Sequence, residues 1–345
     1  MRIIGKKIHA VKIRCLNYNQ GMSLSYKIIL NPVAGNGSGA ASLPKIEQLL
    51  AQNSVSYDMV RTEREGHGIE LTRKAVKDGY DVVVAAGGDG TVNEAINGLM
   101  QCRHEGLPSR HEGLPARQEG LPMPPLGVLC VGRGNDFAGS MGIPTELEAG
   151  VRALMSGQRR TIDIGRVAGG KYPQGRYFGS CVGVGFDAIT TIEVHKLPRW
   201  GGFLAFLAAV LKTVFLYNKA PLATISYDNQ TLTQRSLLIS VMNGRRLGGG
   251  FQMAPDSLPD DGLFDLCIAE QMSSFQVLKM IPHFTRGDQA TQPQIKTGRA
   301  AKVTITAQDG PLPAQTDGEI ICVDGSHLEI EMLPRQLEII YQPQA

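Results

Sequence analysis

Carboxylates beside glycine turns are the residues of this chain best suited to chemistry. The turn Gly87-Gly88-Asp89-Gly90-Thr91 follows a short apolar run, 81–86, which predicts a buried strand. We expect these glycines to adopt positive φ and to let a ligand approach the backbone. The turn opens a helix, whose unpaired N–H groups favour an anion, so we predict a phosphate site in which Asp89 holds Mg²⁺ or makes a hydrogen bond to a ribose or backbone group. The alternative is a structural turn in which Asp89 caps the helix.

A second group of carboxylates follows other glycines. Glu319 ends the turn Asp317-Gly318-Glu319, which can project a side chain into a cleft; the alternative is a solvated hairpin tip. Asp136 and Asp187 are candidates to assist Mg²⁺ or to orient a hydroxyl group, and the alternative for both is a capping or turn role.

The elements that must position the first turn alternate between strands and helices over residues 22–160. Strands are predicted at 26–30, 56–61, 81–86 and 126–131, and helices from 42 or 44, at 69–77, from 92 and at 147–155. This alternation predicts an α/β domain with a mainly parallel sheet. Ligands of such sheets gather at the carboxyl ends of the strands, where residues 31–39, Thr62 and the 87–91 turn are expected.

The pattern of apolar and polar residues changes over residues 161–333. Short alternating runs follow one another, interrupted by only two helix-length segments, 201–217 and 274–285. This pattern predicts a β-rich, antiparallel domain, either a sandwich or a distorted barrel. The last segment, 334–345, either ends this domain or returns to the first one.

Two further segments are expected to lie outside the folded core. Residues 1–21 carry basic residues and no acid, which indicates a disordered leader or, alternatively, a basic arm on anionic lipid. Residues 103–123 repeat Glu-Gly-Leu-Pro every seven residues, and Gly and Pro forbid a helix there, so a flexible insertion is predicted. The net charge of +3 is too small to indicate a nucleic-acid partner. The distant cysteines and the lack of a signal peptide favour a cytoplasmic protein.

Seven motifs in order make the chain similar to a known family. They are Asn31-Pro32 with Gly35, Gly87 to Glu94, Gly134-Asn135-Asp136-Phe137-Ala138 with Gly142-Ile143-Pro144, Gly185-Phe186-Asp187-Ala188, Gly248-Gly249-Gly250, Asp260-Asp261-Gly262-Leu263, and Asp317-Gly318-Glu319. Over residues 24–340 the chain resembles the diacylglycerol kinase catalytic-domain family, which includes bacterial lipid kinases and sphingosine kinases. The resemblance implies ATP- and Mg²⁺-dependent phosphorylation of a lipid hydroxyl, with diacylglycerol the expected substrate, in a cleft between the two domains.

Other functions stay open beside this one. The acceptor could be another lipid alcohol, such as a sphingoid base or phosphatidylglycerol. An enzyme similar to NAD kinases would share the Gly-Gly-Asp-Gly turn, and a non-catalytic nucleotide or lipid sensor is the alternative outside enzymes.

The resemblance also assigns roles by position. Glu319 is the expected general base and Asp89 the second catalytic residue, while Asp136 and Asp187 are the expected substrate contacts. The expected nucleotide contacts are Asn31, Thr62, Gly87, Gly88, Asp89, Gly90, Thr91, Asn93, Glu94, Arg133 and Asn135. A structural Mg²⁺ loop is expected from the Asp261 carboxylate with the Leu258 and Leu263 carbonyls.

The chain departs from the family pattern at several positions. Arg133 stands where the family usually has Thr, and Asn36 and Gly139 stand where many members have a basic residue. We therefore expect Arg133 to supply the positive charge that those two positions lack.

A membrane contact is expected from the segment 196–203. It interleaves Lys196 and Arg199 with Trp200, the only tryptophan, and such residues favour the headgroup boundary. The apolar run 201–217 is short for a membrane span and contains Lys212, so it predicts either a core helix or a helix at the lipid access route. A protein located peripherally at the inner membrane surface is the expectation.

Overall fold

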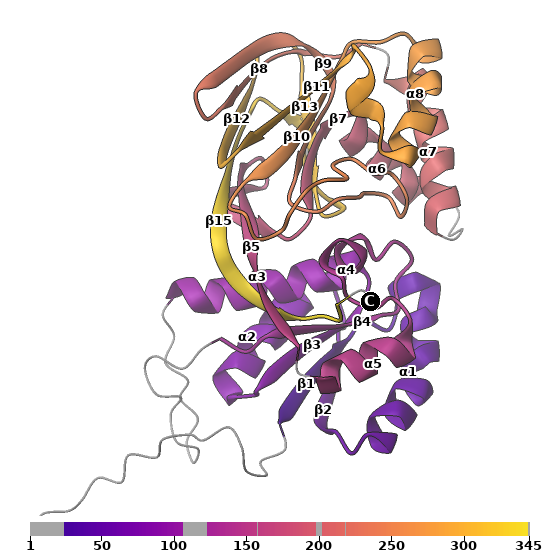
Figure 1. Ribbon diagram of the computed structural model, residues 1–345, viewed down its shortest axis with the longest axis vertical. Coiled ribbons are helices and arrows are strands. Elements are labelled where there is room, and N and C mark those ends of the chain that lie inside the picture. Colours follow the sequence, from indigo (N-terminus) through magenta and orange to yellow (C-terminus); the bar gives the residue numbers. More distant parts are fainter. Residues whose placement is uncertain (1–23, 106–122, 157, 198–201, 218, 344–345) are drawn as a thin grey trace, which may run out of the picture.

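The computed structural model describes residues 24–105, 123–156, 158–197, 202–217 and 219–343. The leader 1–21, most of the 103–123 insertion and the Arg199-Trp200 pair lie outside these ranges. The described chain forms two stacked domains, with the N-terminal α/β domain below the β-rich domain in Figure 1. The predicted fold class is confirmed.

The N-terminal domain is built on a parallel sheet. Its strands are β1 (Ser25–Leu30), β2 (Ser56–Arg61), β3 (Val82–Gly87) and β4 (Leu126–Cys130), in the order β4-β3-β1-β2. The helices are α1 (Ala34–Gln52), α2 (His67–Asp78), α3 (Asp89–Glu105), α4 (Asp136–Met141) and α5 (Leu147–Ser156). Every residue of β3 is buried, as expected for a strand covered by helices on both faces.

The strand register brings the glycine turns to one edge of the sheet. Leu30 is level with Ala86, and Gly87 is level with Cys130, so β1, β3 and β4 end side by side. The loops that follow these three strands carry Asn31, Asp89 and Arg133. The first helix begins earlier than predicted, at Ala34, although Gly35, Asn36 and Gly37 have non-helical backbone angles.

The C-terminal domain is antiparallel. Its strands are β5 (Arg159–Gly169), β6 (Tyr172–Phe178), β7 (Cys181–Gly185), β8 (Leu222–Tyr227), β9 (Gln230–Met242), β10 (Phe264–Glu270), β11 (Ile295–Ala300), β12 (Lys302–Ala307), β13 (Leu312–Thr316) and β14 (Glu319–Gly325). Helices α7 (Gly202–Leu216) and α8 (Ser274–Arg286) correspond to the two predicted helical segments.

One prediction for this domain was wrong, because a third helix, α6 (Phe186–Lys196), interrupts the strands. It escaped the sequence pattern because Thr190, Thr191 and Glu193 are buried polar residues that break its apolar periodicity. The three helices α6, α7 and α8 lie together on one side of the domain (Figure 1).

A long last strand, β15 (His327–Ile340), joins the two domains. Residues 327–331 pair with β12, and residues 329–333 and 337–340 pair with β5, while Ile339 pairs in parallel with Leu126 of β4. The segment from 334 onward therefore returns to the N-terminal domain. The strand bends between Leu333 and Leu337, where Arg335 has a positive φ of 53° and its N–H donates to Asp163 Oδ1 at 2.6 Å.

Candidate active site

The turn between β3 and α3 is made compact by its glycines. A Cβ at Gly87 would lie 2.2 Å from Thr91 Oγ1, and one at Gly132 would lie 2.3 Å from the Cα of Gly88. Gly87 and Gly132 therefore exclude a side chain for lack of space. The expected positive φ is absent, because Gly87, Gly88 and Gly90 are not among the positive-φ residues of the described chain. The approach of a ligand to this backbone stays a prediction.

Asp89 forms a carboxylate pair with Asp136. A Cβ on Gly134 would lie 3.0 Å from Asp89 Oδ2 and 3.4 Å from Asp136 Oδ2, so both carboxylates approach this glycine. Asp89 Oδ1 accepts the Phe137 N–H at 3.0 Å, which ties it to the first turn of α4. Burial, and then the charge of Asp89, raise the pKa of Asp136 to about 7, although the Gly249 N–H lies 3.0 Å from each Asp136 oxygen. Such a pair has the chemistry of a cation site.

Three of the expected nucleotide contacts are bound to neighbouring elements. Asn31 Nδ2 donates to Thr91 Oγ1 at 3.0 Å, which joins the loops after β1 and β3. Glu94 accepts the N–H groups of Gly66 and Gly68, each at 2.7 Å, and so holds the start of α2 against α3. These contacts hold the loops after β1 and β3 and the start of α2 in place around the turn.

Asn93 lies behind the turn rather than in it. Its side chain is fully buried, donates to Asp317 Oδ2 at 2.9 Å and accepts from Arg176 Nη2 at 2.7 Å. The contact therefore joins α3 to the C-terminal domain, and this geometry gives no support to the predicted nucleotide contact at Asn93.

Asp317 and Glu319 bring the C-terminal domain to the glycine turn. The Asp317 carboxylate accepts the N–H groups of Gly179, Ser180 and Cys181 at 2.8, 3.0 and 3.0 Å, in addition to the Asn93 amide. These hydrogen bonds fix the 317–319 turn. In this position, Glu319 Oε1 lies 3.5 Å from where a Cβ on Gly90 would be. Burial raises the pKa of Glu319, while the charge of Arg176 opposes that rise.

The two domains enclose a cleft of about 1000 Å³ at this point. The residues predicted from sequence that line it are Asn31, Thr62, Gly88, Asp89, Gly90, Thr91, Glu94, Arg133 and Glu319. Gly87, Asn93, Asn135, Asp136 and Asp187 do not line it. Several lining residues had no predicted role: Glu63, Arg64, Glu65, Val194, His195 and Phe206. Val194 and His195 belong to α6, and because this helix was not predicted, these two residues were not predicted either.

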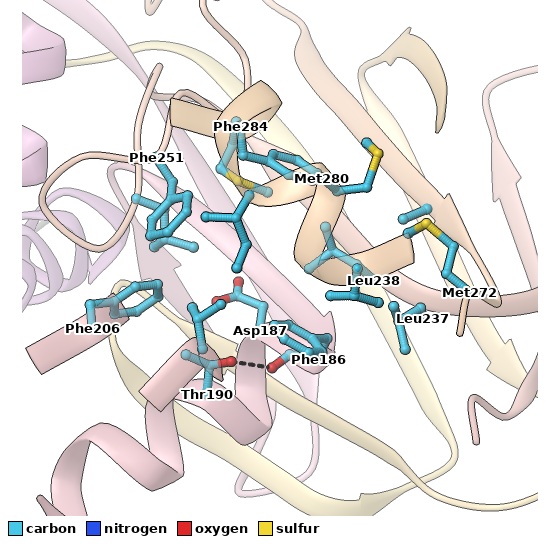
Figure 2. A pocket seen from close by; sticks show the side chains of 16 residues that line it. Phe186, Asp187, Thr190, Phe206, Leu237, Leu238, Phe251, Met272, Met280 and Phe284 are labelled. Atoms are coloured by element: carbon cyan, nitrogen blue, oxygen red, sulfur yellow. Dashed lines mark hydrogen bonds between the residues drawn. The ribbon is translucent and has the colours of Figure 1, made fainter. Parts of the chain in front are cut away.

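A narrow apolar cavity of about 70 Å³ lies deeper in the C-terminal domain (Figure 2). Its walls include Phe206 of α7, Met280 and Phe284 of α8, and Asp187 of α6. Phe206 also lines the large cleft, so this ring lies between the two spaces. Asp187 is buried, which raises its pKa to about 6, while Gln315 Nε2 donates to its Oδ2 at 2.9 Å. Among the described residues, Asp187 Oδ1 has no hydrogen-bond partner.

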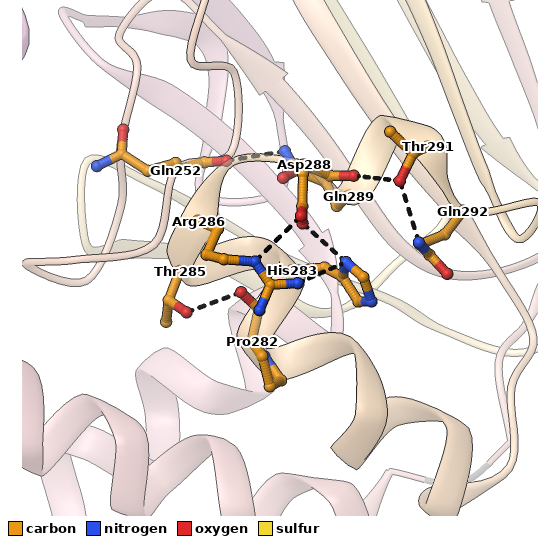
Figure 3. A network of polar contacts seen from close by, with 9 residues as sticks. All are labelled: Gln252, Pro282, His283, Thr285, Arg286, Asp288, Gln289, Thr291 and Gln292. Atoms are coloured by element: carbon orange, nitrogen blue, oxygen red, sulfur yellow. Dashed lines mark hydrogen bonds and ion pairs between the residues drawn. The ribbon is translucent and has the colours of Figure 1, made fainter.

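Polar contacts fix the end of α8 beside this cavity (Figure 3). Asp288 accepts from Arg286 Nε at 3.1 Å and lies 2.7 Å from His283 Nδ1. The buried Gln289 amide donates to the carbonyls of Gln252 and Met253 at 2.8 and 3.0 Å. Because Met253 lines the cavity, the network joins the helix to the opposite wall.

The expected Mg²⁺ loop has a different set of contacts. Asp261 forms an ion pair with Arg299, and its Oδ1 accepts the Leu263 N–H at 3.1 Å. Within the described residues, no three His, Cys, Asp or Glu side chains gather into a metal-binding group. The ligand role of Leu258, Asp261 and Leu263 stays a prediction that this geometry does not support, because an arginine already neutralises the carboxylate.

Known proteins match both halves of the chain. Residues 25–167 match the diacylglycerol kinase catalytic domain, and residues 180–341 match the YegS C-terminal NAD kinase beta sandwich-like domain. The chain is 28% identical over 295 residues to a diacylglycerol kinase of Bacillus subtilis (strain 168), which covers 85% of this chain and 89% of that protein. It is 28% identical over 310 residues to lipid kinase YegS of Escherichia coli (strain K12), covering 89% and 94%.

Solved structures agree on the fold. A putative diacylglycerol kinase from Bacillus anthracis str. Sterne superposes with a TM-score of 0.73 at 22% identity, covering 95% of this chain and 98% of that one. The two matched domains together extend over nearly all of the described chain, in the order that the sequence motifs indicated. The chain belongs to the diacylglycerol kinase catalytic-domain family and is a lipid kinase.

Proposed function

We propose that this protein transfers the γ-phosphate of ATP to the free hydroxyl of diacylglycerol, giving phosphatidic acid. The observation that carries the proposal is the position of Glu319, whose carboxylate from the C-terminal domain lies beside Gly90 of the N-terminal glycine turn. A proton acceptor and a phosphate-binding turn thus share one cleft.

The N-terminal side of the cleft suits a nucleotide. The Gly88–Thr91 backbone opens α3, whose first N–H groups can hold phosphate oxygens. Thr62 and Asn31 line the same space at the ends of β2 and β1. Asp89, which lines the cleft, would hold an ion delivered with the nucleotide, because a triphosphate supplies the other oxygen ligands. Mg²⁺ bound there would neutralise phosphate charge during transfer.

The C-terminal side suits the acceptor. Glu319 would take the proton of the attacking hydroxyl, a contribution of roughly 10²–10⁴-fold in rate. Asp187, with its unpartnered Oδ1, would hold a polar group of the lipid. The apolar cavity behind Phe206 would receive the start of an acyl chain, and its flexible Met and Phe side chains would have to move to admit more.

Helix α7 supplies a surface for the membrane. Phe206 and Val210 point into the cavity, while Leu204, Leu211 and Phe215 are 69%, 42% and 68% exposed. Of the basic residues on helices α7 and α8, Lys212 pairs with Glu193 and Arg286 pairs with Asp288. Lys279, whose ammonium lies over the exposed Phe275 ring, adds a cation that suits an anionic bilayer. No described helix is long and apolar enough to cross a membrane. We therefore propose peripheral contact with the inner membrane surface through this face.

Phosphate transfer to a lipid panel tests the proposal. Purified protein with radiolabelled ATP and Mg²⁺ is offered diacylglycerol, sphingosine, phosphatidylglycerol and NAD. We expect labelled phosphatidic acid as the main product. Labelling of another lipid would replace the substrate assignment, labelling of NAD would favour a soluble acceptor, and no labelling of any acceptor would favour a sensor.

A further inference from the structure

A loop of the C-terminal domain holds α4 at several points. The loop 243–250 follows β9 and crosses to the N-terminal domain. The Arg245 N–H donates to Ser140 Oγ at 3.1 Å, and the Gly249 N–H donates to the Asp136 carboxylate. The two contacts hold opposite ends of this short helix. Because the Phe137 N–H of the same helix donates to Asp89, the loop also acts on the glycine turn.

Arg246 makes the central contact of this loop. Its Nη2 donates to the Asn135 carbonyl at 3.2 Å. Its Nε lies 3.6 Å from Asp136 Oδ1 and has no hydrogen-bond partner within the part of the chain that the structure describes. The Arg246 side chain is 28% exposed and the Asp136 side chain 11%. A guanidinium in this setting interacts more strongly with a carboxylate than it would in water.

The guanidinium occupies the space of a missing side chain. A Cβ on Gly139 would lie 1.6 Å from Arg246 Nη2 and 2.0 Å from its Cζ. Gly139 has an ordinary helical φ, so the backbone does not require glycine there. The available space requires glycine instead, because any side chain at 139 would displace the Arg246 guanidinium.

Arg246 places a positive charge beside Gly139, one of the two positions at which a basic residue was missing, while the charge expected from Arg133 stays a prediction. Arg133 lines the outer cleft, whereas Arg246 lies against the carboxylate pair. The sequence signal was weak, because Arg245 and Arg246 stand next to each other before Gly248 and nothing in the sequence places them at α4.

We propose that Arg246 is a positioning residue for phosphoryl transfer, which holds α4, and through it Asp89, in register with the C-terminal domain. The inference rests on the proposed role of the Asp89 turn. Gly139 is needed beside Arg246, because its missing side chain leaves room for a cation that comes from the other domain. A positively charged side chain from position 139 or from position 246 can fill the space beside Asp136, but there is no room for both.

Five variants test this arrangement through kcat and KM for ATP with diacylglycerol in mixed micelles. Arg246→Ala should lower kcat on the order of 100-fold, as expected for a displaced catalytic group. Arg246→Lys should recover part of that loss, because an ammonium lacks the fork that reaches both Asn135 and Asp136. Gly139→Ala should lower kcat while keeping the melting temperature, because Ala favours a helix and only the guanidinium is displaced.

The fourth variant moves the cation to the other domain. Gly139→Arg in the Arg246→Ala background should recover most of the lost activity, whereas Gly139→Arg alone should be impaired by crowding. Arg166→Ala, which removes an arginine of β5 that pairs with Glu331 of β15, should keep wild-type activity. Unchanged activity of folded Gly139→Ala, or a folded double variant no better than Arg246→Ala, would overturn the proposal.

A readout independent of activity separates this inference from the proposed function. Hydrogen exchange at the Phe137 amide reports directly on the bond to Asp89. We expect faster exchange in Arg246→Ala than in the wild type, and wild-type exchange in Arg166→Ala. Wild-type protein that labels no lipid would refute the function alone, whereas unchanged Phe137 exchange in Arg246→Ala would refute the positioning role alone.

Discussion

Asp317 and Glu319 stand two residues apart in the sequence and have opposite environments. Asp317 accepts bonds from three backbone N–H groups and from the Asn93 amide, so its carboxylate is fully used in holding the structure. Glu319 faces the cleft, where burial raises its pKa. The first residue fixes the turn, and the second is left available to react.

Removal of the Asp317 carboxylate should therefore act on stability first. In Asp317→Ala, donors that are shielded from water lose their acceptor, and we expect the free energy of unfolding to fall by about 3 kcal/mol. Urea denaturation of the variant beside Asp324→Ala measures the loss, because Asp324 is an exposed carboxylate of β14. Equal stabilities of the two variants would contradict the anchoring role.

Arg176 should set the pH at which Glu319 loses activity. A general base works only when deprotonated, so activity should fall as the pH drops through the raised pKa of Glu319. Arg176 opposes that rise, and Arg176→Met should move the acid limb of kcat/KM to higher pH. The pH profile of the variant is compared with that of Arg166→Met. An acid limb that stays in place, or moves to lower pH, would show that Arg176 does not act on the base.

At the scale of elements, α7 has two apolar faces with different surroundings. One face lines the cavity with Phe206 and Val210, and the contacts at the end of α8 keep the opposite wall of that cavity in place. The other face exposes Leu204 and Phe215. A lipid could thus pass from a bilayer to the cleft along one helix.

The exposed face should be needed at membranes and not for catalysis in solution. Leu204→Ser with Phe215→Ser removes two large apolar side chains, each worth roughly 1.5–3 kcal/mol when buried, so binding to anionic vesicles should weaken by well over tenfold. Turnover of a water-soluble short-chain diacylglycerol should stay unchanged. Val323→Ser, at a residue 55% exposed on β14, is the control. Vesicle binding equal to that of the control would show that the membrane contacts another face.

At the scale of the whole molecule, β15 makes the two domains parts of one sheet system. It starts among the strands of the C-terminal domain and ends beside β4, so continuous main chain joins the two domains along one side of the molecule (Figure 1). Asn93, Asp317 and the 243–250 loop add side-chain contacts across the same boundary. The carboxylates of the two domains are therefore held at a defined separation.

Local patterns predicted the strand–turn–helix units and the β-rich second half, because apolar periodicity reports which face of an element is buried. They failed for α6, where buried Thr190 and Glu193 replace apolar residues. Motifs placed Asp89 and Glu319 in one cleft through a family resemblance. Arg246 and Arg176 could not be found this way, since their partners lie in the other domain and no local spacing records that contact.

The most direct test of the account is γ-phosphate transfer from ATP to diacylglycerol by Glu319→Gln, measured with its affinity for ATP and compared with Glu329→Gln, an exposed glutamate on β15. The account predicts a loss of roughly 10²–10⁴-fold in kcat for Glu319→Gln, unchanged ATP affinity and full activity in the control. Wild-type turnover by Glu319→Gln would contradict the assignment of this carboxylate as the base that faces the glycine turn.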